Sequence, residues 1–150
     1  MTGPPSPGRG FPVPARFLVG YDGSEPAQRA ALFAFRLASA TGAKVWLLYA
    51  TDGSPGQAEP VTHEEQESRH GAIRSALRRL EEVGRSLGAP VESVFRDGPP
   101  AEALLAFARE LPADFLLVGT RGLNLPERLV LGSVSSRVVV RARIPVTVVP

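Results

Sequence analysis

Residues 114–149 read DFLLVGTRGLNLPERLVLGSVSSRVVVRARIPVTVV, in which two apolar runs flank a glycine-containing loop and an amphipathic segment. The first run, DFLLVGT (114–120), and the last, PVTVV (145–149), have the apolar character of buried strands. Between them, SVSSRVVVRARI (133–144) is predicted to form a helix. Two strands joined by a helix predict parallel pairing, because parallel strands need a long crossover between them.

The preceding part of the chain repeats this alternation. Further strands are predicted at RFLVGY (16–21), KVWLLYA (44–50) and PVESVFR (90–96), the last with polar residues interleaved as an edge position allows. Helices are predicted at 25–41, 63–88 and 99–112, the first with Pro26 in its first turn and Gly42 at its end. The pattern predicts a doubly wound, Rossmann-like α/β fold. We expect one five-stranded parallel sheet of order 3-2-1-4-5 with helices on both faces.

Composition excludes several classes of protein. The chain has 150 residues, 43% of them hydrophobic, which suits one domain with a proper core. It has no cysteine, so disulfides, thiol nucleophiles and thiolate metal sites are excluded. The formal charge is +2 and the basic residues are scattered, which argues against a nucleic-acid partner.

The ends and the hydropathy of the chain set further expectations. No run of about 18 apolar residues occurs, which argues against a membrane-spanning helix and a membrane partner. The N-terminus lacks the apolar centre of a signal peptide, so a cytoplasmic location is expected. Residues 1–14 are rich in proline and glycine and are expected to form a flexible tail ahead of a domain at 15–150.

The predicted sheet order places a ligand crevice at the carboxyl ends of the first and fourth strands, where the order reverses. The loops that leave these ends are DGSEP, which begins at Asp22, and the glycine-containing loop after Val118. Ser133 is predicted to be the N-cap of the last helix, where free N–H groups and the helix dipole attract an anion. Glycine has no side chain, so Gly119, Gly122 and Gly132 would let a phosphate chain approach the backbone closely. Arg121 is available to pair with the phosphates.

Structural readings of the same residues remain open. The glycines serve tight turns alone in the plainer reading, and Asp22 is then a turn residue within YDGS. Neither G-x-x-x-x-G-K-[ST] nor a G-x-G-x-x-G after the first strand occurs, which argues against P-loop and dinucleotide sites. His63 and His70 are two helical turns apart, roughly 10 Å, too far for one metal ion, and are expected to face solvent. Trp46 is expected in the core.

The glycine spacing resembles a known signature. Gly119-x-x-Gly122, nine residues and then Gly132-Ser133 is similar to the ATP-binding signature G-x-x-G-x(9)-G-[ST] of the universal stress protein family. FLVGYDGSE resembles the first strand of that family with its acidic residue, and RIPVTVV resembles its final strand. The resemblance covers roughly residues 16–150.

The resemblance implies a nucleotide site with two sides. Asp22 would lie beside the ribose, Gly20 under the base, and the backbone of Ala50 would recognise adenine. Val118 and Gly119 would also line the nucleoside side. ATP phosphates, bridged by Mg²⁺ or Mn²⁺, would lie against Arg121, Gly122, Gly132, Ser133, Val134 and Ser135. The family resemblance also implies a homodimer that pairs PVTVV antiparallel with its copy.

Three functions follow as hypotheses. The first is an ATP-binding sensor or adaptor in the stress response with at most slow hydrolysis, because the sequence offers no paired carboxylates and no lysine near the phosphates. The second is a dimeric interaction module of the same fold that binds no nucleotide. The third is an enzyme such as a slow ATPase or nucleotidyl-transfer relative, which the lack of a base or further metal carboxylates disfavours.

Overall fold

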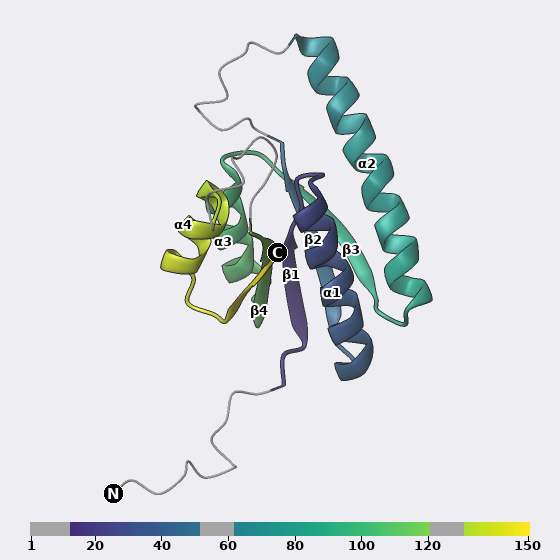
Figure 1. Ribbon diagram of the computed structural model, residues 1–150, viewed down its shortest axis with the longest axis vertical. Helices are drawn as coiled ribbons and strands as arrows, with labels where there is room; N and C mark the ends of the chain where they lie inside the picture. The colour runs from purple at the N-terminus through teal and green to yellow at the C-terminus, as the bar shows by residue number, and fades with distance from the viewer. Residues whose placement is uncertain (1–12, 52–61, 121–130) are drawn as a thin grey trace, which may run out of the picture.

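The computed structural model describes residues 13–51, 62–120 and 131–150, and within these ranges it contains five strands and four helices (Figure 1). The predicted tail therefore lies almost wholly outside the described residues. The elements are β1 (Arg16–Gly20), α1 (Glu25–Thr41), β2 (Lys44–Ala50), α2 (His63–Ser86), β3 (Val91–Arg96), α3 (Pro100–Glu110), β4 (Phe115–Gly119), α4 (Ser133–Arg141) and β5 (Val146–Val149).

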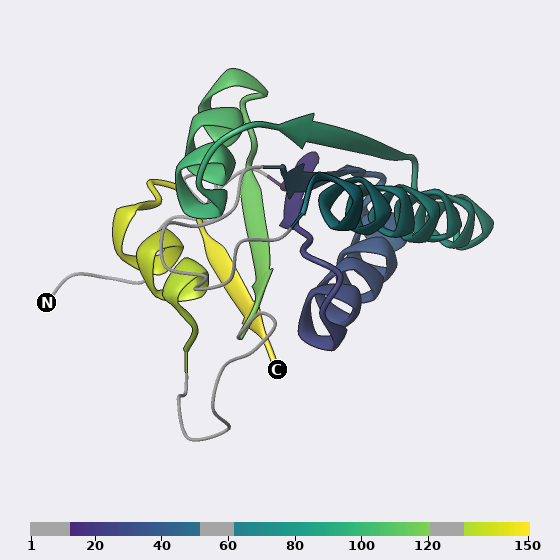
Figure 2. The ribbon, with the colours of Figure 1, turned by 90° about the horizontal axis from the view of Figure 1, so that it is seen from above.

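The sheet is parallel throughout and its order is β3-β2-β1-β4-β5, which confirms the predicted topology. β1 is central, and its Leu18 pairs with Trp46 of β2 and with Leu116 of β4. Seen from above, α1 and α2 cover one face of the sheet, while α3 and α4 cover the other (Figure 2). Each pair of helices encloses its own apolar core. Burial on both faces explains why β1, β2 and β4 are largely apolar runs without alternation, whereas the edge strand β3 carries interleaved polar residues.

Side-chain caps fix the starts of two helices. At α1, Ser24 Oγ accepts a hydrogen bond from the Ala27 N–H at 3.3 Å. At α2, Thr62 Oγ1 accepts from the Glu65 N–H at 3.3 Å, and the Glu65 carboxylate accepts from the Thr62 N–H at 2.8 Å. This reciprocal pair is a capping box. Gly42 ends α1 with φ of 76°, as its position in the sequence predicts.

Three helices are shorter than predicted, and α3 spans Pro100–Glu110 instead of 99–112. α2 ends at Ser86, and the expected terminal residue Gly88 lies beyond it with φ of 85°. α4 ends at Arg141 instead of reaching residue 144, and Ala142 is already extended. Pro145 disfavours helical backbone at the residue before it, Ile144, which accounts for the last predicted position but not for the extended backbone at Ala142. No helix in the described part of the chain is long and apolar enough to cross a membrane.

Candidate functional site

The carboxyl ends of β1 and β4 lie side by side. Val19 pairs with Leu117, so the next residues of both strands leave the sheet at the same edge. A β-carbon placed on Gly20 would lie 3.4 Å from Val118 Cγ1 and 2.8 Å from Leu104 Cδ1. The structure thus brings together Gly20 and Val118, two residues expected at the nucleoside side, and leaves little room for a side chain at position 20.

Asp22 follows at this edge and has a turn role. Its Oδ1 accepts a hydrogen bond from the Ser24 N–H at 2.9 Å, which is an Asx turn, and Ser24 in turn caps α1. The carboxylate is half-buried and uses this one oxygen within the turn. Its second oxygen can accept from a ligand hydroxyl. The turn reading of Asp22 is therefore correct, and the ligand reading remains compatible with it.

Two tyrosines lie near the Asp22 carboxylate. Burial raises the pKa of Tyr21 and of Tyr49, and the negative charge of Asp22 acts in the same direction on both. Arg79 lowers the pKa of Tyr21 and Arg69 lowers that of Tyr49, but neither outweighs burial. Both phenols therefore remain protonated and can donate hydrogen bonds at neutral pH.

Gly119 ends β4 against the first turn of α1. A β-carbon there would lie 2.7 Å from Pro26 Cβ, 2.8 Å from the Pro26 carbonyl carbon and 2.9 Å from the Ala27 nitrogen. Two of these atoms belong to backbone and cannot rotate away. Close packing of a strand end on a helix start therefore requires glycine here, a reason that the sequence readings did not include.

Thr120 joins the end of β4 to the start of α4. The Gly132 N–H donates to the Thr120 carbonyl at 2.6 Å, and the Ser135 hydroxyl lies 2.8 Å from the same carbonyl oxygen. The Ser135 Oγ is also 3.1 Å from the Gly132 carbonyl oxygen, and this serine is 2% exposed. The chain thus returns at 132 to the point that it left at 120. Arg121 and Gly122 lie outside the described residues.

The N-cap of α4 is Gly132, and Ser133 is the first helical residue, so the expected N-cap was wrong by one position. No side chain caps this helix and no acidic residue lies in its first turn. The other described helices differ: α1 and α2 have side-chain caps, and each of α1, α2 and α3 has an acidic first turn. The first internal hydrogen bond of α4 runs from the Ser136 N–H to the Gly132 carbonyl at 2.9 Å. Three N–H groups, those of Ser133, Val134 and Ser135, precede it at the positive end of the helix dipole.

Ala50 occupies the end of β2, two strands from β4. It pairs with Arg96 of β3 and is half-buried on the α3 side of the sheet. The next residue, Thr51, donates its N–H to the Arg96 carbonyl at 2.8 Å, and its hydroxyl contacts the Asp97 carboxylate. The Thr51–Asp97 contact joins the residue after β2 to the residue after β3, and no sequence pattern predicted it.

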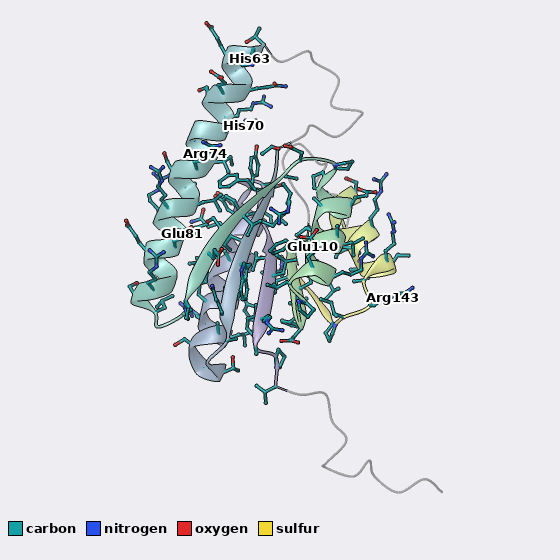
Figure 3. The ribbon with its side chains drawn as sticks, turned by 180° about the vertical axis from the view of Figure 1, so that it is seen from behind. His63, His70, Arg74, Glu81, Glu110 and Arg143 are labelled. Carbon is teal, nitrogen blue, oxygen red and sulfur yellow. The ribbon has the colours of Figure 1, made fainter. Side chains whose placement is uncertain are left out.

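Two of the other expectations need correction. His63 is exposed and lies 3.7 Å from Glu67, but His70, which lies on the same helix (Figure 3), is half-buried edge-on to the Tyr49 ring at 5.9 Å between centroids. Trp46 packs against the core on the α3 side of the sheet but is only half-buried, and the Lys44 ammonium lies over its ring at 4.7 Å. In the described part of the chain, no three acidic or histidine side chains are grouped to hold a metal ion.

Comparison with known proteins gives a consistent result. The model of the universal stress protein family matches residues 15–150. A universal stress protein of Thermus aquaticus is 38% identical over 138 residues, which cover 88% of this chain and 96% of the relative. A universal stress protein, UspA, from Lactobacillus plantarum superposes with a TM-score of 0.80 at 25% identity, over 91% of this chain and 97% of that one. Another universal stress protein, solved in complex with cAMP, has a TM-score of 0.70 at 30% identity, over 92% and 98% of the two chains.

Proposed function

This chain belongs to the universal stress protein family, and from that premise we propose that it binds ATP, with Mg²⁺ or Mn²⁺, at the carboxyl edge of β1 and β4. Nucleotide binding would make the protein a sensor or adaptor in the stress response. The start of α4 carries the proposal, since it is free of a side-chain cap and of acidic residues in its first turn. An anion is stabilised at such a helix end by free N–H groups and by the dipole.

We assign the nucleoside to one side of the edge and the phosphates to the other. The nucleoside side comprises Gly20, Asp22, Ala50, Val118 and Gly119, of which Asp22 has an oxygen available for ribose hydroxyls. The relative solved with cAMP supports an adenine nucleotide as the ligand class. The phosphate side comprises Arg121, Gly122, Gly132, Ser133, Val134 and Ser135.

Burial distinguishes two of the phosphate-side serines. Ser133 is exposed at the first helical position, so its hydroxyl and its N–H can both reach a phosphate. The Ser135 hydroxyl is engaged with the Thr120 carbonyl, so we assign a phosphate contact only to the Ser135 N–H. The divalent cation would be held mainly through phosphate oxygens, in keeping with the lack of a carboxylate or histidine cluster in the described ranges. We therefore expect binding with slow hydrolysis at most.

We further propose that two copies pair along β5. Phe33 and Val139 are 43% and 44% exposed, and they lie on helices that cover opposite faces of the sheet. Arg29, one turn before Phe33, donates to the Pro150 carbonyl at 2.7 Å, which places this side of α1 beside the end of β5. Arg141 approaches Glu102 of α3. Val139 is two residues earlier and therefore lies on the opposite side of α4, away from α3. Apolar side chains thus flank the β5 edge on both faces, where a paired copy would cover them.

Isothermal titration calorimetry with ATP and Mg²⁺ tests the nucleotide site, with GTP as the comparison. We expect one saturable site per chain at micromolar ATP, and weaker binding of GTP. Ser133→Glu places a carboxylate at the proposed phosphate position, while Ser133→Gln has the same shape without the charge. The charged variant should lose at least about tenfold in affinity relative to the glutamine variant, because like charges in close contact repel.

Two outcomes would contradict this proposal in different ways. Equal ATP affinity of the Ser133→Glu and Ser133→Gln variants would show that the phosphates do not lie at the start of α4. No heat of binding for the parent protein up to millimolar ATP would instead favour the dimeric module that binds no nucleotide.

A further inference from the structure

The two outer strands of the sheet differ in how their open edges are treated. In β3, the Pro90 and Arg96 carbonyls accept hydrogen bonds from β2 and the residue after it. Because parallel strands alternate the direction of their backbone groups, the even-numbered residues of this strand face β2. Val91, Ser93 and Phe95 therefore turn their N–H and carbonyl groups toward the open edge.

Side chains bond to two of these outward groups. Glu81 of α2 accepts a hydrogen bond from the Ser93 N–H at 3.1 Å between Oε1 and the nitrogen. The guanidinium of Arg96 donates to the Phe95 carbonyl at 3.3 Å. One donor and one acceptor of the open edge are thus already occupied, and a further strand would have to displace both side chains.

Both side chains are held in place from opposite faces of the sheet. Glu81 is paired with Arg85 one turn later at 3.5 Å, and its side chain is only 21% exposed. Arg96 lies 3.4 Å from Glu110 and 5.0 Å over the ring of Phe107, both on α3. Figure 3 shows Glu81 and Glu110 on helices at opposite sides of β3. The edge is therefore covered from α2 and from the α3 side at once.

The outward-facing backbone groups within β5 have no such cover among the described residues; Arg29 donates to the carbonyl of Pro150, which lies beyond the end of the strand. The Pro145 and Val149 carbonyls accept from the N–H groups of Leu116 and Thr120, so the odd-numbered residues face β4. Val146 and Val148 turn their backbone groups outward, and no side chain of the described residues bonds to them. An open edge of this kind is a template for pairing with another chain.

We propose that Glu81 and Arg96 seal β3 against a second copy of this chain, so that strand pairing is restricted to β5 and the assembly closes at two copies. β3 is then a latent pairing surface whose occupant, once it is uncovered, is another copy of the same chain. A sheet that paired at both edges would extend without closing, whereas one open edge gives a closed symmetric pair. The sealing of β3 does not depend on nucleotide binding.

Removal of both caps tests this proposal. The variant Glu81→Ala/Arg96→Ala uncovers the edge, and the control Glu82→Ala/Arg78→Ala removes the same charges from exposed positions of α2. Light scattering after size exclusion, over a series of concentrations, measures the mass of each. We expect the uncapped variant to form species heavier than the parent, in a fraction that rises with concentration, while the control keeps the parent mass. An uncapped variant with the parent mass at every concentration would overturn the proposal.

A second pair of variants keeps the test decisive if the double variant does not fold. Glu81→Gln retains an acceptor oxygen for the Ser93 N–H, and Glu81→Ala does not. Hydrogen exchange at the Ser93 amide should be about fivefold to tenfold faster in Glu81→Ala than in Glu81→Gln, the factor expected for one lost hydrogen bond. The alanine variant alone should also gain heavier species; equal exchange and equal mass would overturn the proposal.

The parent mass reports separately on pairing through β5. A parent of one-chain mass would contradict the proposed dimer, yet the uncapped variant should still become heavier than the parent. The failure of one proposal is thereby distinguished from the failure of the other.

Discussion

Ser133 and Ser135 lie in the same turn of α4, but their hydroxyls should respond to removal in opposite ways. Ser135 is buried and bonded to the Thr120 carbonyl, while Ser133 is exposed at the start of the helix. We therefore expect Ser135→Ala to lower stability with little effect on ATP affinity. Ser133→Ala should lower ATP affinity with little effect on stability.

The size of the Ser135→Ala effect follows from its contacts. One buried hydrogen bond of 2.8 Å is lost, which costs about 1 kcal/mol. The Thr120 carbonyl keeps its hydrogen bond from the Gly132 N–H at 2.6 Å, so no acceptor is left unpaired and the cost does not rise further. For a chain of this length, 1 kcal/mol corresponds to a fall in the melting temperature of about 3 °C.

Urea unfolding followed by circular dichroism measures the stability of both variants, and calorimetry measures their affinity for ATP. The parent and the two variants are compared in the absence of nucleotide, because bound ligand would itself raise the apparent stability. A Ser135→Ala variant with parental stability and weakened ATP binding would refute the reasoning. Its hydroxyl would then contact the phosphate in addition to the Ser135 N–H.

Two further variant series test the packing and the capping of α2. A β-carbon on the buried Gly84 would lie 2.2 Å from a side-chain atom of β3, so Gly84→Ala should destabilise by about 1–3 kcal/mol in urea unfolding. Gly71→Ala, with nothing within 4 Å, should stabilise by about 0.5–1 kcal/mol. Stabilisation by both variants would show that helix propensity outweighs the packing of Gly84. Hydrogen bonds from the backbone and side chain of Thr62 hold the pKa of Glu65 below its ordinary value of 4.5. The ionised Glu65 carboxylate therefore adds to the free energy of unfolding above pH 4.5, and this contribution is lost as the pH falls through the lower pKa of the folded state. Relative to the intrinsic exchange rate at each pH, amide exchange in the first turn of α2 should become faster in acid for the parent and stay constant in Glu65→Gln. A loss of protection in that variant equal to the parent's would contradict the assignment to this carboxylate.

The sheet order can be predicted from the sequence because it depends on short-range pattern and on general rules of connection. KVWLLYA and DFLLVG are uninterrupted apolar runs, which fits strands covered on both faces. Right-handed crossovers then restrict the order of the strands. The start of α1 is similarly local, since Ser24 and Ala27 are three residues apart.

Other features depend on partners far along the chain and escape such reasoning. Glycine and serine both suit an N-cap, so the sequence alone does not decide between Gly132 and Ser133. In the structure, the Gly132 N–H and the Ser135 hydroxyl both bond to the carbonyl of Thr120, twelve residues before Gly132. The half-burial of His70 on α2 depends on its contact with the ring of Tyr49, which lies in β2. The cover of β3 by Glu81 is a contact between a helical carboxylate and a backbone group twelve residues away. None of these contacts has a local sequence signal.

Two glycines of the signature have roles within the fold itself. Gly119 is required by the packing of α1, and Gly132 is the N-cap of α4; Gly122 lies outside the described residues. A relative that bound no nucleotide would still need Gly119 for this packing, so Gly119 alone is not evidence of a ligand site. The stronger argument for ATP is that the first turn of α4 has no acidic residue and no side-chain cap. An acidic first turn stabilises a helix by about 0.3–1 kcal/mol, and α1, α2 and α3 each have one. A chain that omits this stabilisation at α4 keeps its helix start free for an external anion, which is the role that a phosphate would fill.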